Sequence, residues 1–136
     1  MNLVQVEIEE IHIFKDKPLN LVLLREIGGK RILPIYIGNF EVAGLEEAVM
    51  KKRYHPRPCT YELFEEVIKA FSLRIKMVEI YKIENEIYYA YIYFTDRNKR
   101  REHKIDCRPS DAMVLAYMKN APIYVNEEVF KKAGIN

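Results

Sequence analysis

The first part of the chain alternates apolar and polar residues with a period of two, a pattern that predicts β-strands. Over residues 3–13 the apolar positions keep one phase until Glu9, after which they move by one residue. A β-bulge near Glu9 accounts for the slip, because one extra residue shifts the alternation. Residues 19–27 and 32–37 predict two further strands, and Gly28-Gly29 between them predicts a hairpin turn.

Apolar residues then recur at helical spacing from Phe40 to about residue 53, which predicts an amphipathic helix. The prolines of residues 55–58 cannot continue that helix, because proline lacks the amide donor and restricts the residue before it. A second helix therefore begins at Thr60, a good N-cap. We expect the buried face of this helix to consist of Leu63, Phe64, Val67, Ile68 and Phe71.

The second half of the chain repeats the layout of the first. Three strands are predicted, over residues 73–80, 87–94 and 103–107. A nearly all-apolar helix over residues 109–118 follows them and is expected to be central. A β-β-β-α unit therefore occurs twice, which indicates a pseudo-duplication. A short strand over residues 123–125 and a small helix capped by Asn126 complete the pattern.

The strand over residues 87–94 carries aromatic rings on both of its faces. One set of rings is expected in the core, and the other is expected to be covered by a helix or by a second subunit. Self-association is a simpler interpretation of the second set than base stacking. We therefore expect a homodimer.

Composition limits the fold and the partners. The chain has 136 residues, 49% of them hydrophobic and 31% charged, which is typical of a globular protein. This length allows one domain, residues 1–136, of the α+β class, with a mixed sheet built from two related β-β-β-α halves and helices packed on it. The abundance of Glu, Lys and Ile, with Gln5 as the only glutamine and no tryptophan, is a bias of hyperthermophile proteins.

The charge balance excludes partners that need a strong global field. The formal net charge is +2, from 22 Lys+Arg against 20 Asp+Glu, so any anion site must be local. No apolar run approaches the roughly 20 residues needed to span a bilayer, and we expect no membrane partner. The first residues show no secretory signal, so we expect a cytoplasmic protein.

Two strand-to-helix junctions, residues 38–41 and 106–111, are the dense polar segments of the chain. The familiar catalytic motifs are missing from the sequence: it has no Walker loop, GxGxxG, HExxH, CxxC or GxSxG. If both junctions face one cleft, they could hold a hard divalent cation such as Mg²⁺ or Mn²⁺ through oxygen ligands. The carboxylates that would do so are Glu41, Asp106 and Asp111. The arginines that would hold a phosphate are Arg57 and Arg108.

The same residues have structural explanations that the sequence leaves open. Ser110 and Asp111 suit a helix N-cap and first turn, and Glu41 gains the same stabilisation from the helix dipole. The arginines could also pair with the carboxylates in an internal ion-pair network. The basic segments 51–57 and 97–104 could neutralise backbone phosphates or could be solvated loops. No metal-binding spacing relates the histidines and cysteines, which are His12, His55, His103, Cys59 and Cys107.

Four sequence blocks resemble the signature of the bifunctional nuclease family. In chain order they are LPIYIGNFE at residues 33–41, PRPCT at residues 56–60, DCRPSDA at residues 106–112 and APIYV at residues 121–125. Together they extend from residue 33 to residue 125 in the family's order, which makes chance similarity a poor explanation. The resemblance implies a single α+β domain and, for some members, hydrolysis of both DNA and RNA.

The resemblance also selects site residues. The family's recurring polar positions fall here on Glu41, Arg57, Thr60, Asp106, Arg108, Ser110 and Asp111. Thr60 and Ser110 thereby join the two arginines as candidate substrate-binding residues. The family's second helix usually opens with Thr-His-Asp, whereas this chain has Thr60-Tyr61-Glu62, which counts against histidine-dependent catalysis. His55 lies just upstream, and nothing in the sequence shows that it substitutes.

These observations predict a metal-dependent nuclease that hydrolyses DNA and RNA with low sequence specificity. The alternative is a non-catalytic module that binds an anion or a protein partner through the same junctions. A third interpretation makes the charged groups of the junctions purely structural.

Overall fold

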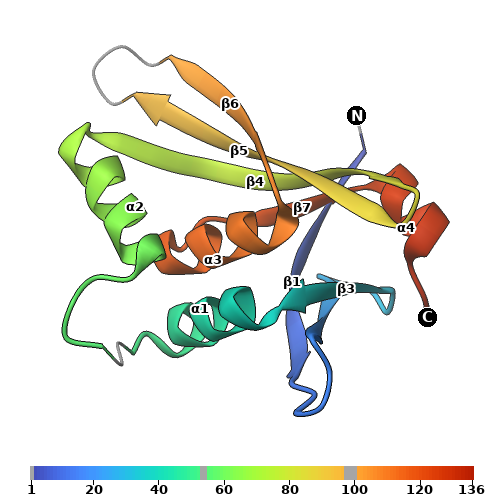
Figure 1. Cartoon of the computed structure of the whole chain (residues 1–136). Coiled ribbons are helices and arrows are strands. Elements are labelled where there is room, and N and C mark those ends of the chain that lie inside the picture. Colours follow the sequence, from blue (N-terminus) through green and yellow to red (C-terminus); the bar gives the residue numbers. More distant parts are fainter. Residues whose placement is uncertain (1, 53–54, 97–100) are drawn as a thin grey trace.

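The computed structural model of the chain, shown in Figure 1, describes residues 2–52, 55–96 and 101–136. In these residues the strands and helices follow the order that the sequence predicts. The elements are β1 (Leu3–His12), β2 (Leu19–Glu26), β3 (Ile32–Gly38), α1 (Asn39–Met50), α2 (Thr60–Ala70), β4 (Leu73–Glu84), β5 (Ile87–Asp96), β6 (Glu102–Cys107), α3 (Pro109–Lys119), β7 (Ile123–Asn126) and α4 (Glu127–Ala133).

The strands form one mixed sheet in the order β3-β2-β1-β7-β4-β5-β6. Within each half neighbouring strands run antiparallel, β1 to β3 in the first and β4 to β6 in the second. β7 pairs antiparallel with β1 and parallel with β4, so it joins the two halves. The predicted α+β domain with two β-β-β-α halves is therefore confirmed.

The predicted bulge in the first strand is present. The register of β1 against β2 shifts between Ile8 and Glu10, where Glu9 is the extra residue. β4 has two such shifts against β5. Bulges bend strands, and Figure 1 shows β4 to β6 passing above α3 while β3 leads into α1 below it.

The central position predicted for the third helix is confirmed. α3 packs beside α1 and against β4 and β5 (Figure 1). Five consecutive residues of α3 are at most 3% exposed: Ala112, Met113, Val114, Leu115 and Ala116. A helix that is buried on all sides needs such a continuous apolar run. The burial of these residues holds α3, including its first turn, in place between α1 and the sheet.

The predicted buried face of α2 is confirmed at Ile68 and wrong at the other four positions. The helix buries Tyr61 and Glu62 together with Ile68. The apolar stripe expected in the core lies at the surface, with Leu63 60%, Phe64 45%, Val67 44% and Phe71 71% exposed. The helical spacing of apolar residues shows that a helix has an apolar face. It does not show whether that face meets the chain's own core or another surface.

The N-caps of α2 and α3 differ from the expected residues by one or two positions, whereas the predicted N-cap of α4, Asn126, is confirmed. Cys59, and not Thr60, is the N-cap of α2, and its sulfur accepts the backbone N–H of Glu62. The Glu62 carboxylate in turn accepts the Cys59 backbone N–H at 2.9 Å. α3 begins at Pro109 with Arg108 as N-cap, so Ser110 lies inside the first turn. Proline suits this first position because its missing N–H would have no partner in the helix.

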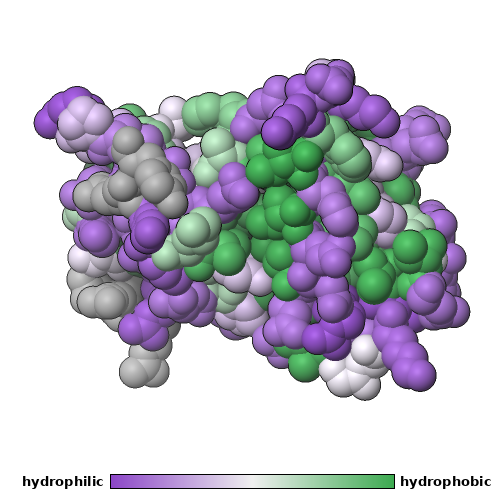
Figure 2. Space-filling model, turned by 90° about the horizontal axis from the view of Figure 1, so that it is seen from below, coloured by the Kyte–Doolittle hydropathy of each residue, from purple (hydrophilic) through white to green (hydrophobic). Residues whose placement is uncertain are grey.

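Exposed hydrophobic side chains are not confined to α2. The face drawn in Figure 2 carries hydrophobic groups in its middle, bordered by hydrophilic ones. Large exposed side chains on and around α1 include Phe40 at 55% and Met50 at 54%. In the described part of the chain, no helix has the length and apolar character to cross a membrane.

Candidate functional site at the two strand-to-helix junctions

The two polar junctions predicted from the sequence meet in the structure through Arg108. Its Nη2 donates to Glu41 Oε2 at 3.0 Å, and its Nε donates to Asp111 Oδ2 at 3.0 Å. Glu41 lies in the first turn of α1, and Asp111 lies in the first turn of α3. The packing of α1 beside α3 brings these turns together, and equivalent positions of the two halves thereby form one cluster. Arg108, Glu41 and Asp111 are called the junction cluster below.

Backbone geometry at the end of β3 directs Glu41 into the cluster. Gly38 is the N-cap of α1 in an extended conformation. A Cβ atom at position 38 would lie only 2.5 Å from Glu41 Oε1, so a larger residue would displace the carboxylate. The side chain of Glu41 is 14% exposed, whereas that of Arg108 is 65% exposed. The carboxylate is therefore the fixed member of this pair and the guanidinium is the movable one.

A tyrosine that the sequence did not identify holds Asp111. The Tyr61 hydroxyl donates to Asp111 Oδ1 at 2.7 Å. Burial and this hydrogen bond raise the pKa of Tyr61, so the phenol remains a neutral donor. The sequence feature that could have pointed to Tyr61 is its position in Thr60-Tyr61-Glu62, where the resemblance to the family leads one to expect histidine.

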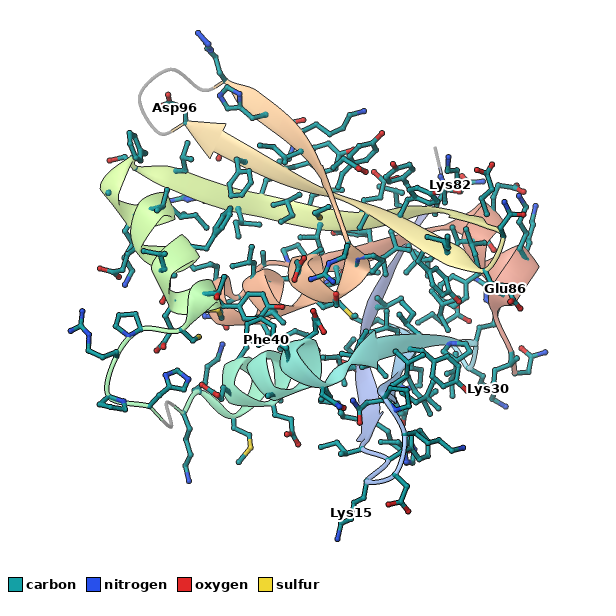
Figure 3. All side chains as sticks on the ribbon, viewed as in Figure 1. Lys15, Lys30, Phe40, Lys82, Glu86 and Asp96 are labelled. Atoms are coloured by element: carbon teal, nitrogen blue, oxygen red, sulfur yellow. The ribbon has the colours of Figure 1, made fainter. Side chains whose placement is uncertain are left out.

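Two contacts fix the ring of Tyr61. It stacks on Phe40 at a centroid distance of 5.5 Å, and Figure 3 shows Phe40 between α1 and α3. A Cβ atom at position 44 would lie 2.5 Å from the Tyr61 ring, so Gly44 lets the ring approach α1. Tyr61 therefore connects the start of α2 to the junction cluster.

The junction cluster has an excess of negative charge. Its two carboxylates, Glu41 and Asp111, face the single guanidinium of Arg108. The hydrogen bond and charge of Asp111, assisted by Glu41, raise the pKa of Arg108, which stays protonated. Carboxylate oxygens are ligands that Mg²⁺ and Mn²⁺ accept, so the donor set fits a hard cation once Arg108 moves aside.

A pocket of about 320 Å³ opens beside the junction cluster. Glu41, Arg108 and Ser110 line it on the polar side, and Tyr36 and Tyr88 contribute aromatic rings. Clefts of this size and mixed lining are typical of small-ligand sites. The cluster therefore borders a space that can receive part of a substrate.

The structure does not bring Asp106 to Glu41 and Asp111. Asp106 pairs with Tyr91 across β5 and β6, while Cys107 pairs with the buried Ala90 on the helix-covered face. Because side chains alternate along a strand, Asp106 lies on the opposite face. There its Oδ1 accepts the Tyr81 hydroxyl at 2.8 Å. The predicted triad is thus reduced to two carboxylates at the cluster.

The outer sheet face that carries Asp106 is built from tyrosines. The Tyr81 ring stacks on that of Tyr91 at 3.9 Å. Burial, with the hydrogen bonds of this network, raises the pKa of Tyr81. Burial and a hydrogen bond to Glu79 raise the pKa of Tyr93 to about 12. Aromatic rings therefore occupy both faces of this strand, as expected, and the outer set lies across the sheet from the junction cluster.

The other predicted site residues, Ser110, Thr60 and Arg57, lie at different places relative to the junction cluster. Ser110 is buried, 7% exposed, at the pocket. Thr60 is exposed as the first residue of α2, and Arg57 is exposed on the loop before it. Neither of these two lines the pocket beside Arg108. Of the predicted basic segments, residues 53–54 and 97–100 lie outside the described part of the chain.

The bifunctional nuclease domain matches residues 22–136, which include both junctions. The chain belongs to the bifunctional nuclease family. The resemblance stated from the four sequence blocks is thereby confirmed, and the junction cluster is built from residues of two of those blocks.

The relatives of this bifunctional nuclease domain differ in what their names say. An uncharacterized protein of Mycobacterium tuberculosis strain H37Rv is 37% identical over 133 residues, covering 95% of this chain and 76% of the relative. Bifunctional nuclease 1 of Oryza sativa subsp. indica is 28% identical over 116 residues, covering 85% of this chain and 35% of the relative. Bifunctional nuclease 2 of Oryza sativa subsp. japonica is 30% identical over the same length and share. The chain thus spans about a third of these plant proteins.

Proposed function

We propose that this protein is a metal-dependent nuclease that hydrolyses phosphodiester bonds in DNA and RNA with low sequence specificity. The observation that carries the proposal is the junction cluster, two carboxylates and one arginine from two helix starts, at the edge of a pocket of about 320 Å³. Family membership and the names of the plant relatives support the same class of reaction.

Each member of the cluster has a role in this proposal. Glu41 and Asp111 would hold Mg²⁺ or Mn²⁺, which when bound polarises a phosphoryl oxygen and lowers the pKa of a water. Tyr61 orients Asp111 by donating to it. Arg108, exposed and movable, leaves the carboxylates and binds the phosphate through its planar donors. The pocket rings of Tyr36 and Tyr88 offer surfaces on which a base can stack.

The charge of the cluster favours this function over the alternative of a non-catalytic anion-binding module. Two carboxylates against one guanidinium leave a net negative charge, which attracts a cation and repels a free anion. A phosphate is more readily accepted when a divalent cation has first been bound. This balance could not be derived from the sequence, because it depends on which groups meet.

We also propose a homodimer that forms through the exposed apolar face of α2. Leu63, Phe64, Val67 and Phe71 are between 44% and 71% exposed on one helix face. Contiguous exposed apolar surface of this kind marks association sites. The interface differs from the aromatic strand on which the sequence prediction of a dimer was based.

The decisive experiment measures cleavage of single-stranded DNA, duplex DNA and RNA by purified protein with Mg²⁺, Mn²⁺ or EDTA. We expect metal-dependent cleavage that Glu41→Gln and Asp111→Asn each lower by about 100-fold or more. Asp106→Asn should cost much less than Asp111→Asn, because Asp106 lies on the opposite sheet face. A larger loss in Asp111→Asn than in Asp106→Asn would show that position in the folded structure, and not nearness in the sequence motif, decides which carboxylates act in cleavage.

Glu66→Gln is the matched control, because Glu66 is an exposed carboxylate of α2 that pairs along its own helix with Lys69. It removes one negative charge and should leave cleavage unchanged. Circular dichroism checks that each variant is folded. Equal cleavage by the wild type and a folded Glu41→Gln/Asp111→Asn double variant would contradict the proposal and point to a contaminating enzyme. If the wild type does not cleave any substrate and the Glu41→Gln and Asp111→Asn variants only melt at a lower temperature, the structural interpretation of the ion pairs is supported.

A further inference from the structure

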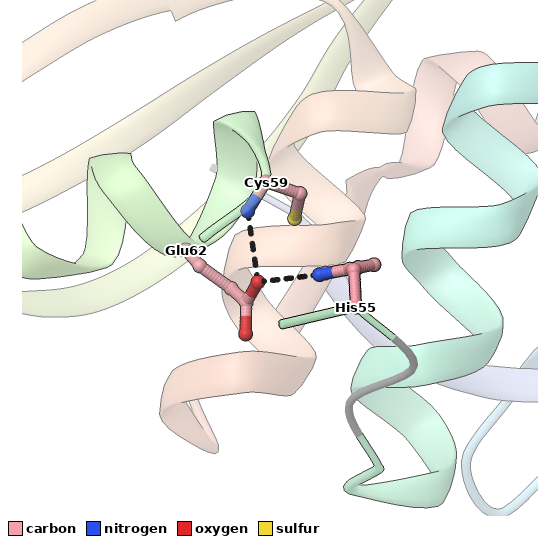
Figure 4. Close-up of side chains that lie close together, drawn as sticks. All are labelled: His55, Cys59 and Glu62. Carbon is pink, nitrogen blue, oxygen red and sulfur yellow. Dashed lines mark hydrogen bonds and ion pairs between the residues drawn. The ribbon is translucent and has the colours of Figure 1, made fainter. Parts of the chain in front are cut away.

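A second cluster of reactive side chains lies at the other side of the start of α2. His55 comes from the loop after α1, Cys59 is the N-cap of α2, and Glu62 lies in its first turn. The ligand atoms of these three side chains lie within 4.8 Å of one another. Figure 4 shows His55 and Glu62 directed toward each other, with the Cys59 sulfur beside them. An imidazole, a thiol and a carboxylate thus converge from a segment of only eight residues.

The surroundings of the His55 ring call for a cation. Nδ1 lies 3.1 Å from Glu62 Oε1 and 3.1 Å from the Arg57 carbonyl oxygen. Nε2 lies 3.0 Å from Glu47 Oε1. Both ring nitrogens therefore face acceptors, whereas a neutral imidazole has only one N–H to donate. A proton or a metal ion at Nδ1 completes this arrangement.

Glu47 has the position of a residue that orients a metal-binding histidine. Metal-binding histidines usually donate their second ring N–H to a carboxylate, which fixes the tautomer and the ring. With Nε2–H donated to Glu47, Nδ1 of His55 keeps a lone pair and lies 3.1 Å from Glu62 Oε1. Glu47 lies on α1, so the ring is held between two helices.

Cys59 and Glu62 are held in place by the helix start itself. The sulfur accepts the Glu62 backbone N–H, and the carboxylate accepts the Cys59 backbone N–H at 2.9 Å. These bonds fix the positions of both side chains at the start of the helix. A separate pocket of about 220 Å³, lined by Glu47, Cys59 and Glu62, gives access from solvent. The cluster is thus preorganised and reachable.

We propose that His55, Cys59 and Glu62 bind a zinc-type transition metal ion, with Glu47 as a positioning residue and a fourth coordination position open to the pocket. Nitrogen, sulfur and oxygen donors together suit Zn²⁺ and disfavour Mg²⁺ and Ca²⁺, which take oxygen ligands. This site is distinct from the junction cluster, where only hard oxygen donors meet. It uses His55 and Cys59, which no spacing in the sequence related to each other.

The test is a Co²⁺ titration of the full chain, followed by absorbance. We expect a thiolate-to-cobalt charge-transfer band that saturates at one metal per chain and disappears when Zn²⁺ is added. Cys59→Ser should abolish the band while preserving the helix start, because serine is a good N-cap. Cys107→Ala is the matched control and should keep the band, since Cys107 lies at the end of β6.

Further variants separate ligands from supporting residues. His55→Ala should abolish the band, and Glu47→Gln should keep it with about 10- to 100-fold weaker affinity. A wild type without the band, or a band that survives in Cys59→Ser, would overturn the proposed site. Unchanged affinity in Glu47→Gln would overturn the positioning role. Because the readout is metal binding, failure here leaves the proposed nuclease activity of the junction cluster unaffected, and the reverse also holds.

Discussion

At the residue scale, the position of Asp111 depends on a neutral phenol. Tyr61 donates to one carboxylate oxygen while Arg108 donates to both. The tyrosine is buried, whereas the arginine is exposed. If Arg108 leaves the carboxylate to bind a phosphate, Tyr61 is the contact that continues to orient Asp111.

The variant Tyr61→Phe isolates this contact because it removes one oxygen and keeps the stacked ring. We expect the free energy of unfolding to fall by about 1.5–3 kcal/mol, the usual contribution of a hydrogen bond to a charged group. Cleavage should fall by roughly 10-fold, as for other residues that support a ligand. Urea unfolding and cleavage kinetics measure the two effects.

Tyr93→Phe is the matched control for this prediction. Its hydroxyl donates to the buried Glu79 at 2.8 Å on the outer face of the sheet. It should lose stability in the same way and keep its rate of cleavage. Equal losses of cleavage in both variants would show that Tyr61 acts through stability alone.

Burial of the thiol yields a second prediction at this scale. Burial, with the nearby charges of Asp111 and Asp106, raises the pKa of Cys107 to about 12. The thiolate is the nucleophile, so Cys107 should resist alkylation by iodoacetamide at neutral pH in the folded protein. Mass spectrometry of peptides after brief labelling measures this, and full reaction in urea is the control. Rapid labelling of Cys107 in the folded protein would contradict the burial.

Some residues of the candidate site could be predicted from the sequence and others could not. Glu41, Arg108 and Asp111 were identified because they stand at equivalent junctions of a repeated unit. Asp106 was grouped with them because it is near in sequence, yet strand alternation places it on the far face. Which face the helices cover is a tertiary property. The cluster of His55 with Glu62 depends on a loop conformation, which has no periodic signal.

At the element scale, α2 presents most of its apolar side chains to solvent. The helix packs against β4 and α3, and its Tyr61 ring stacks on Phe40 of α1. Its length and apolar spacing were predictable, because they depend on local sequence. Its partner was not, because the same spacing serves a core contact and a contact with another molecule.

If α2 forms the homodimer interface, Leu63→Ser/Phe71→Ser should convert the dimer to a monomer. Both side chains are at least 60% exposed, so the melting temperature of the monomer should change little. Sedimentation velocity measures the mass in solution. Ile13→Ser, which alters a side chain that is 50% exposed in another region, is the control. A monomeric wild type, or a dimer that survives the double substitution, would contradict the interface.

At the scale of the whole molecule, Arg31 connects the turn between β2 and β3 to α4 near the end of the sequence. It donates to Glu26 Oε2 at 2.8 Å and to Glu127 Oε2 at 2.5 Å. Its hydrogen bonds hold the pKa values of both carboxyls below their ordinary value. The guanidinium also lies over the Phe130 ring, at 4.6 Å from its centre. The turn between β2 and β3 is thereby fastened to α4.

This tie predicts a loss of stability in acid. Because the folded-state pKa values of Glu26 and Glu127 are lowered, their contribution is complete above the ordinary value of 4.5 and is lost as the pH falls through the lowered values. The melting temperature should therefore differ most between the wild type and Glu26→Gln/Glu127→Gln near neutral pH. The difference should shrink below about pH 4.5. Circular dichroism melting curves across this range provide the measurement, and a constant difference would contradict the tie.

The place of β7 in the sheet has a consequence for how the protein is made. The strands of the two halves cannot form one sheet until residues 123–126 are available, because β7 alone pairs with both β1 and β4 among the described strands. During translation the first β-β-β-α unit leaves the ribosome with the edge of β1 uncovered. The growing chain must therefore be kept from pairing that edge with a neighbour, and the sheet closes only after nearly all of this sequence has emerged.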